Sequence, residues 1–110
     1  MDIVFRTRKL ERTFNSEQEL VKEYGKQCAR KIRIRMAVLR AATSLADVPT
    51  APPDRCHELK GNKNGHFAVD LVHPFRLVFR PHGIELQKAG KIRKETVSVI
   101  MITDVEDYHR

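Results

Sequence analysis

A proline-rich stretch divides this sequence into two halves with different hydrophobic periods. Pro49, Pro52 and Pro53 end any preceding helix, because proline lacks the backbone N–H and clashes with the turn before it. Apolar residues before this stretch recur at helical spacing, whereas those after it alternate with polar residues, as in strands. The stretch is too short to separate two domains. We therefore expect residues 1–110 to form a single α+β domain.

The first half predicts a short strand and two helices. Period-two alternation over 2–6 indicates the strand. Ser16 and Glu19 have the spacing of a capping box, which predicts a helix over 17–24. A longer helix is expected over roughly 26–46, because one apolar stripe runs along it. Its members are Cys28, Ile32, Met36, Leu39 and Ala46.

A second stripe on the longer helix is basic and consists of Lys26, Arg30, Arg33 and Arg40. Lys and Arg are normally exposed, so this stripe is typical of an ordinary solvated helix face. It also has the spacing of a surface that could follow a phosphate backbone. The sequence leaves both interpretations open.

The second half predicts a mainly antiparallel sheet on which the helices pack. Strands are expected at 57–59, 67–71, 75–80 and 96–103, and the last of these is apolar and β-branched enough for a central position. Gly and Asn residues at 61–65 favour a turn. The basic stretch 88–94 is expected to form an exposed hairpin tip.

The net charge of the chain indicates which classes of binding partner are favoured. The chain carries 21 Lys+Arg and 14 Asp+Glu, a formal net charge of +7. Such a protein favours an anionic partner: nucleic acid first, then an acidic protein, then a membrane surface. No apolar run approaches the roughly 20 residues that span a bilayer.

The cysteine pattern and the start of the sequence predict the compartment. Cys28 and Cys56 are isolated, with no Cys-x-x-Cys motif, and the start of the sequence shows no signal-peptide pattern. Both features predict free thiols and a cytoplasmic location.

Four short segments together resemble one family. They are His-Glu-Leu-Lys-Gly at 57–61, Gly-x-Phe at 65–67, Phe-Arg-Leu-Val-Phe at 75–79 and Glu-Asp-Tyr-His at 106–109. In this order they resemble the HigB branch of the RelE/ParE superfamily, the toxins of type II toxin–antitoxin pairs. The resemblance implies a compact RelE-like fold, ordered β-α-α-β-β-β, with two N-terminal helices packed on the sheet.

The same resemblance implies a function and its partners. These toxins are metal-independent endoribonucleases that cut mRNA on the ribosome, where they contact ribosomal RNA, and they need no cofactor. Each is held silent by a cognate antitoxin, typically a helix-turn-helix DNA-binding protein. The chain departs from the family in having Phe67 and Phe75 where Trp is usual, and in an enlarged basic hairpin at 85–95.

RNA cleavage without a metal uses the 2′-hydroxyl of the substrate as nucleophile. It needs a base for that proton, an acid for the leaving oxygen and positive charge near the phosphate. Histidine suits proton transfer, because its ordinary pKa of ~6.5 lies near neutrality. The resemblance assigns proton transfer to His57 and His109 without deciding which is base and which is acid.

The remaining candidates support those histidines. In an extended tail Asp107 would point the same way as His109 and orient it, while Tyr108 would stack on a base or donate a hydrogen bond. Lys60 and Arg76 are candidates for binding the phosphate. Each candidate also has an ordinary structural explanation. His109 could be a frayed tail residue, Asp107 a solvated acid and Tyr108 a cap on the core. His57 could be a structural turn histidine, and Lys60 and Arg76 could be surface cations.

Other reactive side chains fit no role. His66, His73 and His82 are expected in turns or on the surface. Cys56 lacks a visible base or oxyanion arrangement, and no spacing of Cys and His matches a standard zinc site. We therefore expect no metal.

Two functions without catalysis remain as alternatives. The ParE branch shares the fold and inhibits DNA gyrase, a role that needs no terminal histidine. A regulatory protein that binds RNA or protein and has lost catalysis is the second alternative.

Overall fold

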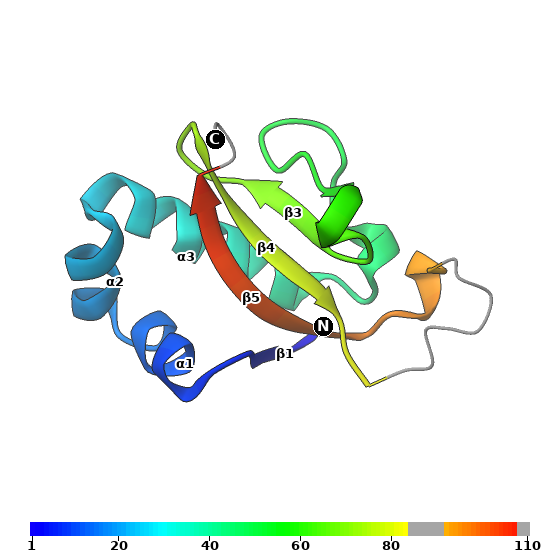
Figure 1. Cartoon of the computed structure of the whole chain (residues 1–110), viewed down its shortest axis with the longest axis horizontal. Coiled ribbons are helices and arrows are strands. Elements are labelled where there is room, and N and C mark those ends of the chain that lie inside the picture. Colours follow the sequence, from blue (N-terminus) through cyan, green and yellow to red (C-terminus); the bar gives the residue numbers. More distant parts are fainter. Residues whose placement is uncertain (84–91, 108–110) are drawn as a thin grey trace.

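The helices form one layer against one face of a sheet (Figure 1). The computed structural model describes residues 1–83 and 92–107. Within these ranges the helices are α1 (Arg8–Phe14), α2 (Glu17–Tyr24) and α3 (Lys26–Ala41). The strands there are β1 (Asp2–Phe5), β2 (His57–Glu58), β3 (Phe67–Asp70), β4 (Phe75–Pro81) and β5 (Val99–Asp107). Single 3₁₀ turns occupy Leu45–Asp47, Gly61–Lys63 and Lys94–Thr96.

The described strands form one sheet in the order β1-β5-β4-β3-β2. β5 pairs in parallel with β1 and antiparallel with β4. The pairs β3–β4 and β2–β3 are also antiparallel. This arrangement confirms the expected α+β fold with a mainly antiparallel sheet.

The sequence signals for the two longer helices are confirmed, with one correction. The Ser16 hydroxyl accepts a hydrogen bond from the Glu19 N–H at 3.1 Å and so caps α2. The stripe from Cys28 to Leu39 is buried. The prediction that α3 runs to residue 46 is wrong, because Ala42 adopts an extended conformation and ends the helix. Ala46 lies in a 3₁₀ turn instead and is exposed.

A third helix, α1, was not predicted from the sequence. The Thr7 hydroxyl accepts from the Leu10 N–H at 3.1 Å and caps this seven-residue helix, which contains no fully buried residue. Phe14 at its end lies between Phe5 and Tyr24, at ring-centroid distances of 5.5 and 6.4 Å. This aromatic contact joins α1 to both the sheet and the helix layer.

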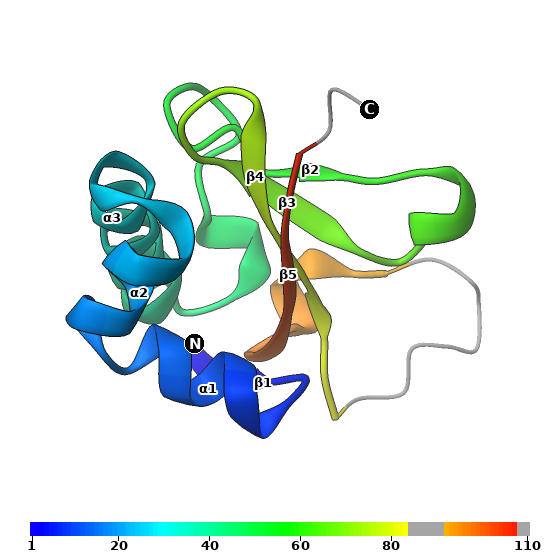
Figure 2. The ribbon, with the colours of Figure 1, turned by 60° about the vertical axis from the view of Figure 1, so that its left-hand side comes forward.

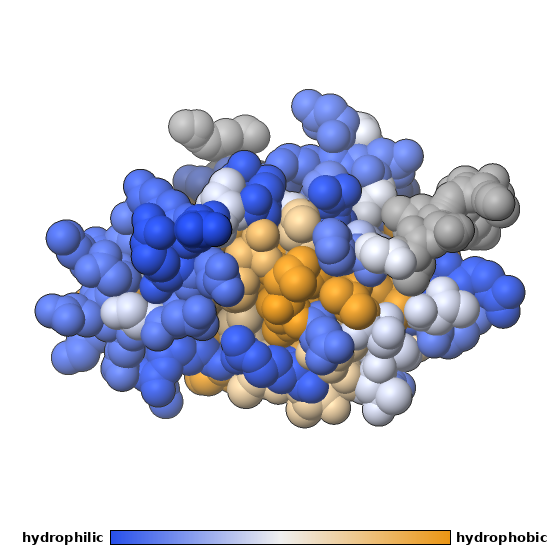
Figure 3. All heavy atoms as spheres, turned by 90° about the horizontal axis from the view of Figure 1, so that it is seen from below, coloured by the Kyte–Doolittle hydropathy of each residue, from blue (hydrophilic) through white to orange (hydrophobic). Residues whose placement is uncertain are grey.

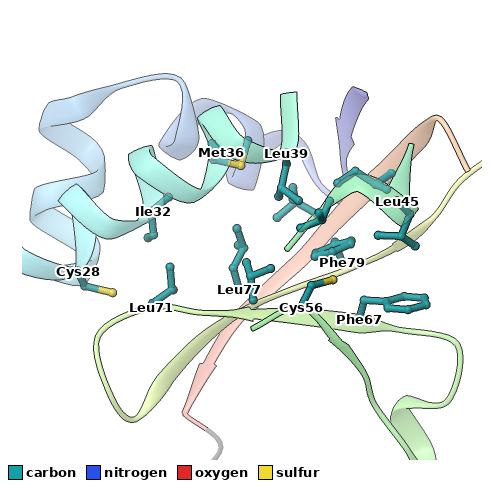
Figure 4. Packing of buried hydrophobic residues seen from close by; sticks show 14 of the residues in the cluster. Cys28, Ile32, Met36, Leu39, Leu45, Cys56, Phe67, Leu71, Leu77 and Phe79 are labelled. Atoms are coloured by element: carbon teal, nitrogen blue, oxygen red, sulfur yellow. The ribbon is translucent and has the colours of Figure 1, made fainter. Parts of the chain in front are cut away.

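The hydrophobic core lies between α3 and the sheet, as Figure 4 shows. Ile32 and Leu39 of α3 are fully buried there. Phe67 and Phe79 stack from neighbouring strands at a centroid distance of 6.2 Å. Figure 2 shows α1, α2 and α3 on one side of the sheet, and within the described residues no α-helix lies over the opposite side.

The bounds of β5 differ most from the sequence prediction. β5 begins at Val99 rather than at residue 96, and it continues to Asp107 through a region expected to be a tail. The predicted hairpin tip at 88–94 and the enlarged hairpin at 85–95 lie largely outside the described residues.

Figure 3 shows the molecule from below, where an apolar area lies beside the hydrophilic helical region.

Candidate active site on the open face of the sheet

Strand alternation separates the side chains of the sheet into a covered face and an open face. Leu77 and Phe79 of β4 belong to the core against α3. Arg76 and Val78 therefore point to the other side, because successive side chains of a strand alternate. Val78 is the register partner of Ala68, which is in turn the partner of His57. His57 and Arg76 thus lie on the same open face.

The floor of this face is a small apolar cluster. Leu59, Ala68 and Val78 are 6, 0 and 0% exposed, and they form a cluster separate from the main core. The Leu59 N–H donates to the His66 carbonyl at 2.9 Å, which holds the chain after β2 over the sheet. The resulting surface has an apolar floor with polar side chains around it.

His57 is half-buried at the edge of this floor and has a fixed ring contact. Its Nδ1 lies 2.8 Å from the Arg55 carbonyl oxygen. A carbonyl oxygen only accepts hydrogen bonds, so Nδ1 must carry the hydrogen. The other ring nitrogen, Nε2, is then the one that can accept a proton from the neutral ring.

Arg76 is largely buried beside a carboxylate. It is the register partner of Glu106, and the Arg76 Nη2 lies 3.6 Å from the Glu106 Oε1. Their side chains are 18 and 26% exposed. Arg76 therefore leaves the face that Leu77 buries, as the sequence predicted. β3 separates β4 from β2, and Arg76 lies two residues along β4 from Val78, which is level with His57. The Cα atoms of His57 and Arg76 are therefore about 12 Å apart across the sheet.

A second set of charges ties the Gly61–Lys63 turn to β5. The Lys63 Nζ lies 3.3 Å from one Asp104 carboxylate oxygen, and the Arg6 Nη2 lies 3.6 Å from the other. Lys60, the sequence candidate for phosphate binding, is exposed at the start of this turn. The turn thus presents Lys60 beside the strand that carries His57.

Of the C-terminal candidates, Asp107 alone lies within the described residues. Asp107 is exposed and is the register partner of Phe75, so alternation directs it away from the face of Arg76. The structure does not bring Asp107 beside His57. Tyr108 and His109 lie outside the described residues.

Glu106 is the carboxylate beside Arg76 on the open face, and sequence reasoning did not single it out. The available signal was the alternation of Asp104 and Glu106 with Val105, which extends the strand pattern toward the C-terminus.

The buried thiols lack the properties of nucleophiles. Burial raises the pKa of Cys56 to about 11 and also raises the pKa of Cys28. Both cysteines are free and protonated at neutral pH. In residues 1–83 and 92–107 no His, Cys, Asp and Glu side chains gather as a metal site would require. No helix in these ranges is long and apolar enough to cross a membrane.

Comparison with known proteins identifies the fold. The chain is similar to the YoeB–YefM complex from Staphylococcus aureus, with a TM-score of 0.57, 15% identity and coverage of 96% of this chain and 94% of that one. It is also similar to the YoeB/ParE toxin from Agrobacterium tumefaciens, with a TM-score of 0.58, 14% identity and coverage of 97 and 98%. No protein-family model and no curated protein matches the sequence. The chain therefore has the fold of the YoeB and ParE toxins.

Proposed function

We propose that this chain is the toxin of a type II toxin–antitoxin pair, a HigB-like endoribonuclease that cleaves mRNA on the ribosome without a metal ion. The placement of His57 and Arg76 on one open face, in a fold similar to YoeB and ParE toxins, carries this proposal. A positive chain with an uncovered polar sheet face suits an extended anionic polymer. The order of the four sequence segments described above supports the HigB branch within this fold.

The proposed reaction is an internal transfer at one phosphate. The 2′-oxygen forms a bond to phosphorus while the bond to the 5′-oxygen breaks, leaving a 2′,3′-cyclic phosphate and a 5′-hydroxyl. One histidine takes the 2′ proton and the other gives a proton to the 5′-oxygen. His57 and His109 share these two roles.

Positive charge near the phosphate is the second requirement of the reaction. Arg76 offers a guanidinium held in place by Glu106, and Lys60 offers an exposed ammonium beside β2. Both would offset the negative charge that grows on the phosphate during transfer. The alternation of β5 favours Glu106 over Asp107 as the carboxylate of the site, while Tyr108 and His109 enter from the resemblance.

The partners follow from the same proposal. The exposed basic stripe of α3 (Lys26, Arg30, Arg33 and Arg40) is suited to ribosomal RNA, and an mRNA on the ribosome places the protein in the cytoplasm. A cognate antitoxin, with a helix-turn-helix DNA-binding domain, would hold the toxin silent. The S. aureus neighbour is itself a complex, which supports a protein partner for this fold.

Primer extension on a reporter mRNA in a cell-free translation reaction tests the function. We expect discrete cuts with the unchanged protein, and their loss in His57→Ala and in His109→Ala. His73→Ala is the matched control, because His73 is exposed in the turn before β4 and should leave the cuts intact. The products should carry 5′-hydroxyl ends, which accept phosphate from a polynucleotide kinase without prior dephosphorylation.

Intact mRNA in the presence of folded, unchanged protein would overturn the ribonuclease proposal. A supercoiling assay with DNA gyrase and an RNA-binding assay without cleavage would then distinguish the two non-catalytic alternatives.

A further inference from the structure

A buried arginine anchors the segment that precedes His57. Arg35 of α3 is only 4% exposed. Its Nε donates to the Asp70 carbonyl at 2.7 Å, and its Nη2 donates to the Pro53 carbonyl at 3.2 Å. Asp54, also buried, brings a carboxylate oxygen to 3.7 Å from the same Nε. The helix layer thus fixes both the proline-rich connector and the end of β3.

A second arginine closes this anchor from the solvent side. The Arg55 guanidinium donates to both carboxylate oxygens of Asp70, at 2.7 and 2.9 Å. The Asp70 N–H donates to the Asp54 carbonyl at 2.9 Å. Paired arginine–carboxylate bonds of this kind fix orientation as well as distance. The segment 53–55 is therefore held to β3 through both side chains and backbone.

Arg55 has an unusual backbone conformation inside this anchor. Its φ is +48°, and within residues 1–83 and 92–107 it is the one non-glycine residue with a positive φ. Residues other than glycine adopt this left-handed region rarely, and a surrounding structure must hold them there. In this conformation the Arg55 carbonyl oxygen meets the His57 Nδ1 at 2.8 Å.

We propose that Arg35, Arg55 and Asp70 are positioning residues that fix the ring and the tautomer of His57. The Arg55 carbonyl holds the hydrogen on Nδ1, so Nε2 becomes the nitrogen that exchanges a proton on the open face. This inference rests on the proposed function for its catalytic meaning. The tautomer itself is a property of the folded chain and is measurable without RNA.

A purely structural role for the same residues makes a different prediction. If the network only stabilised the connector, its loss would lower stability and leave the His57 tautomer as it is. If it positions His57, its loss must release Nδ1 and let the ring adopt the Nε2–H form that free histidine prefers. The tautomer therefore separates the two roles.

Nitrogen NMR of the imidazole measures that tautomer directly. The full chain is labelled with ¹⁵N in a His109→Ala background, which limits growth arrest during expression, and spectra are recorded where the ring is neutral. We expect His57 to be mainly Nδ1–H. A mainly Nε2–H ring in this protein would overturn the proposal.

Substitutions at 55 and 70 then test the network. Arg55→Val resists the left-handed conformation, whereas Arg55→Asn tolerates it and serves as the matched control. We expect Arg55→Val and Asp70→Ala to lose most of the Nδ1–H form, with a smaller loss in Arg55→Asn. Arg35→Ala is not used, because it removes the partner of a buried carboxylate and threatens folding. An unchanged tautomer in folded Arg55→Val and Asp70→Ala would also overturn the proposal.

Cleavage assays on proteins that keep His109 test whether the network also matters for function. Arg55→Val and Asp70→Ala should reduce mRNA cleavage about tenfold or more, since correctly placed acid–base groups supply effects of this size or larger. Full cleavage by these variants would overturn the positioning role. If the unchanged protein cuts no RNA while the tautomer results hold, the proposed function fails and the control of His57 by the network stands.

Discussion

The face of the sheet that packs on α3 and the face left open differ in what their side chains touch. On the covered face Leu77 and Phe79 are fully buried against the helix layer. On the open face charges stand in pairs such as Arg76–Glu106 and Lys63–Asp104, around a small apolar floor. The same strands supply both faces, because their side chains alternate. Stability and chemistry should therefore respond to different positions of one strand.

β4 offers the strongest test of this separation. Phe79→Ala removes a ring that is 0% exposed and stacks on Phe67, so it should lower the free energy of unfolding by about 3–5 kcal/mol. Arg80→Ala on the neighbouring exposed position should change it by less than about 0.5 kcal/mol. Urea unfolding followed by far-ultraviolet circular dichroism measures both. A loss below about 1 kcal/mol in Phe79→Ala would show that the helix layer does not depend on this ring.

The open face should show the reverse pattern. Arg76→Gln removes the charge proposed to face the phosphate, and we expect mRNA cleavage to fall about 10²-fold. Because the change also leaves Glu106 without its ion-pair partner Arg76, cleavage is measured at a temperature where circular dichroism shows the variant to be folded. Arg80→Gln is the matched control on the same strand and face, where Arg80 is exposed and contacts Met101. Equal losses in both variants would mean that only net charge matters, which would contradict a specific site.

Alkaline pH should weaken the covered side in part through the Cys56 thiol. Burial raises the pKa of Cys56 from its ordinary value of 9.0 to about 11, so the folded state keeps a proton that the unfolded state releases. Stability from this group is present below pH 9 and is lost as pH rises toward 11, a change of about 2–3 kcal/mol. Unfolding measured from pH 8 to 11 should show a shallower fall in Cys56→Ala. Identical slopes in both proteins would contradict the assignment.

The smallest expected effect lies in the helix layer, at the cap of α2. Ser16→Ala removes the acceptor for the Glu19 N–H and should lower the free energy of unfolding by about 1 kcal/mol. RNA cleavage should be unchanged, because α2 lies on the covered side. Thermal melting and the primer-extension assay together check both halves of this expectation. A loss of cleavage without a change in melting would place α2 in the site.

Much of the covered side was predictable, because its signals are local. The capping box at Ser16 and the stripe from Cys28 to Leu39 depend on residues within a few positions of one another. α1 escaped prediction because it spans seven residues, so Leu10 and Phe14 alone mark its apolar side. The end of α3 was misplaced because Ala41 and Ala42 are strong helix formers, so the local sequence favours a longer helix, whereas Ala42 is extended.

The open side was harder to predict, because its contacts join distant segments. His57 and Arg76 are candidates that a motif resemblance suggested, and alternation correctly put Arg76 opposite to Leu77. Arg35 was missed, because an arginine in a basic helix is normally solvated, whereas here two backbone carbonyls and Asp54 receive it. Glu106 was missed because the extent of β5 depends on pairing with β4, which the local sequence does not reveal.

The parallel pairing of β1 with β5 has a consequence for biosynthesis. Asp2 aligns with Val99, so the strand made first must wait for the strand made last. The helices and β2–β4 can form earlier, since their contacts are closer in the sequence. Until β5 emerges, β1 and β4 both expose an unpaired backbone edge to other chains. In the folded sheet β5 lies between them and so joins the first described strand to the antiparallel strands.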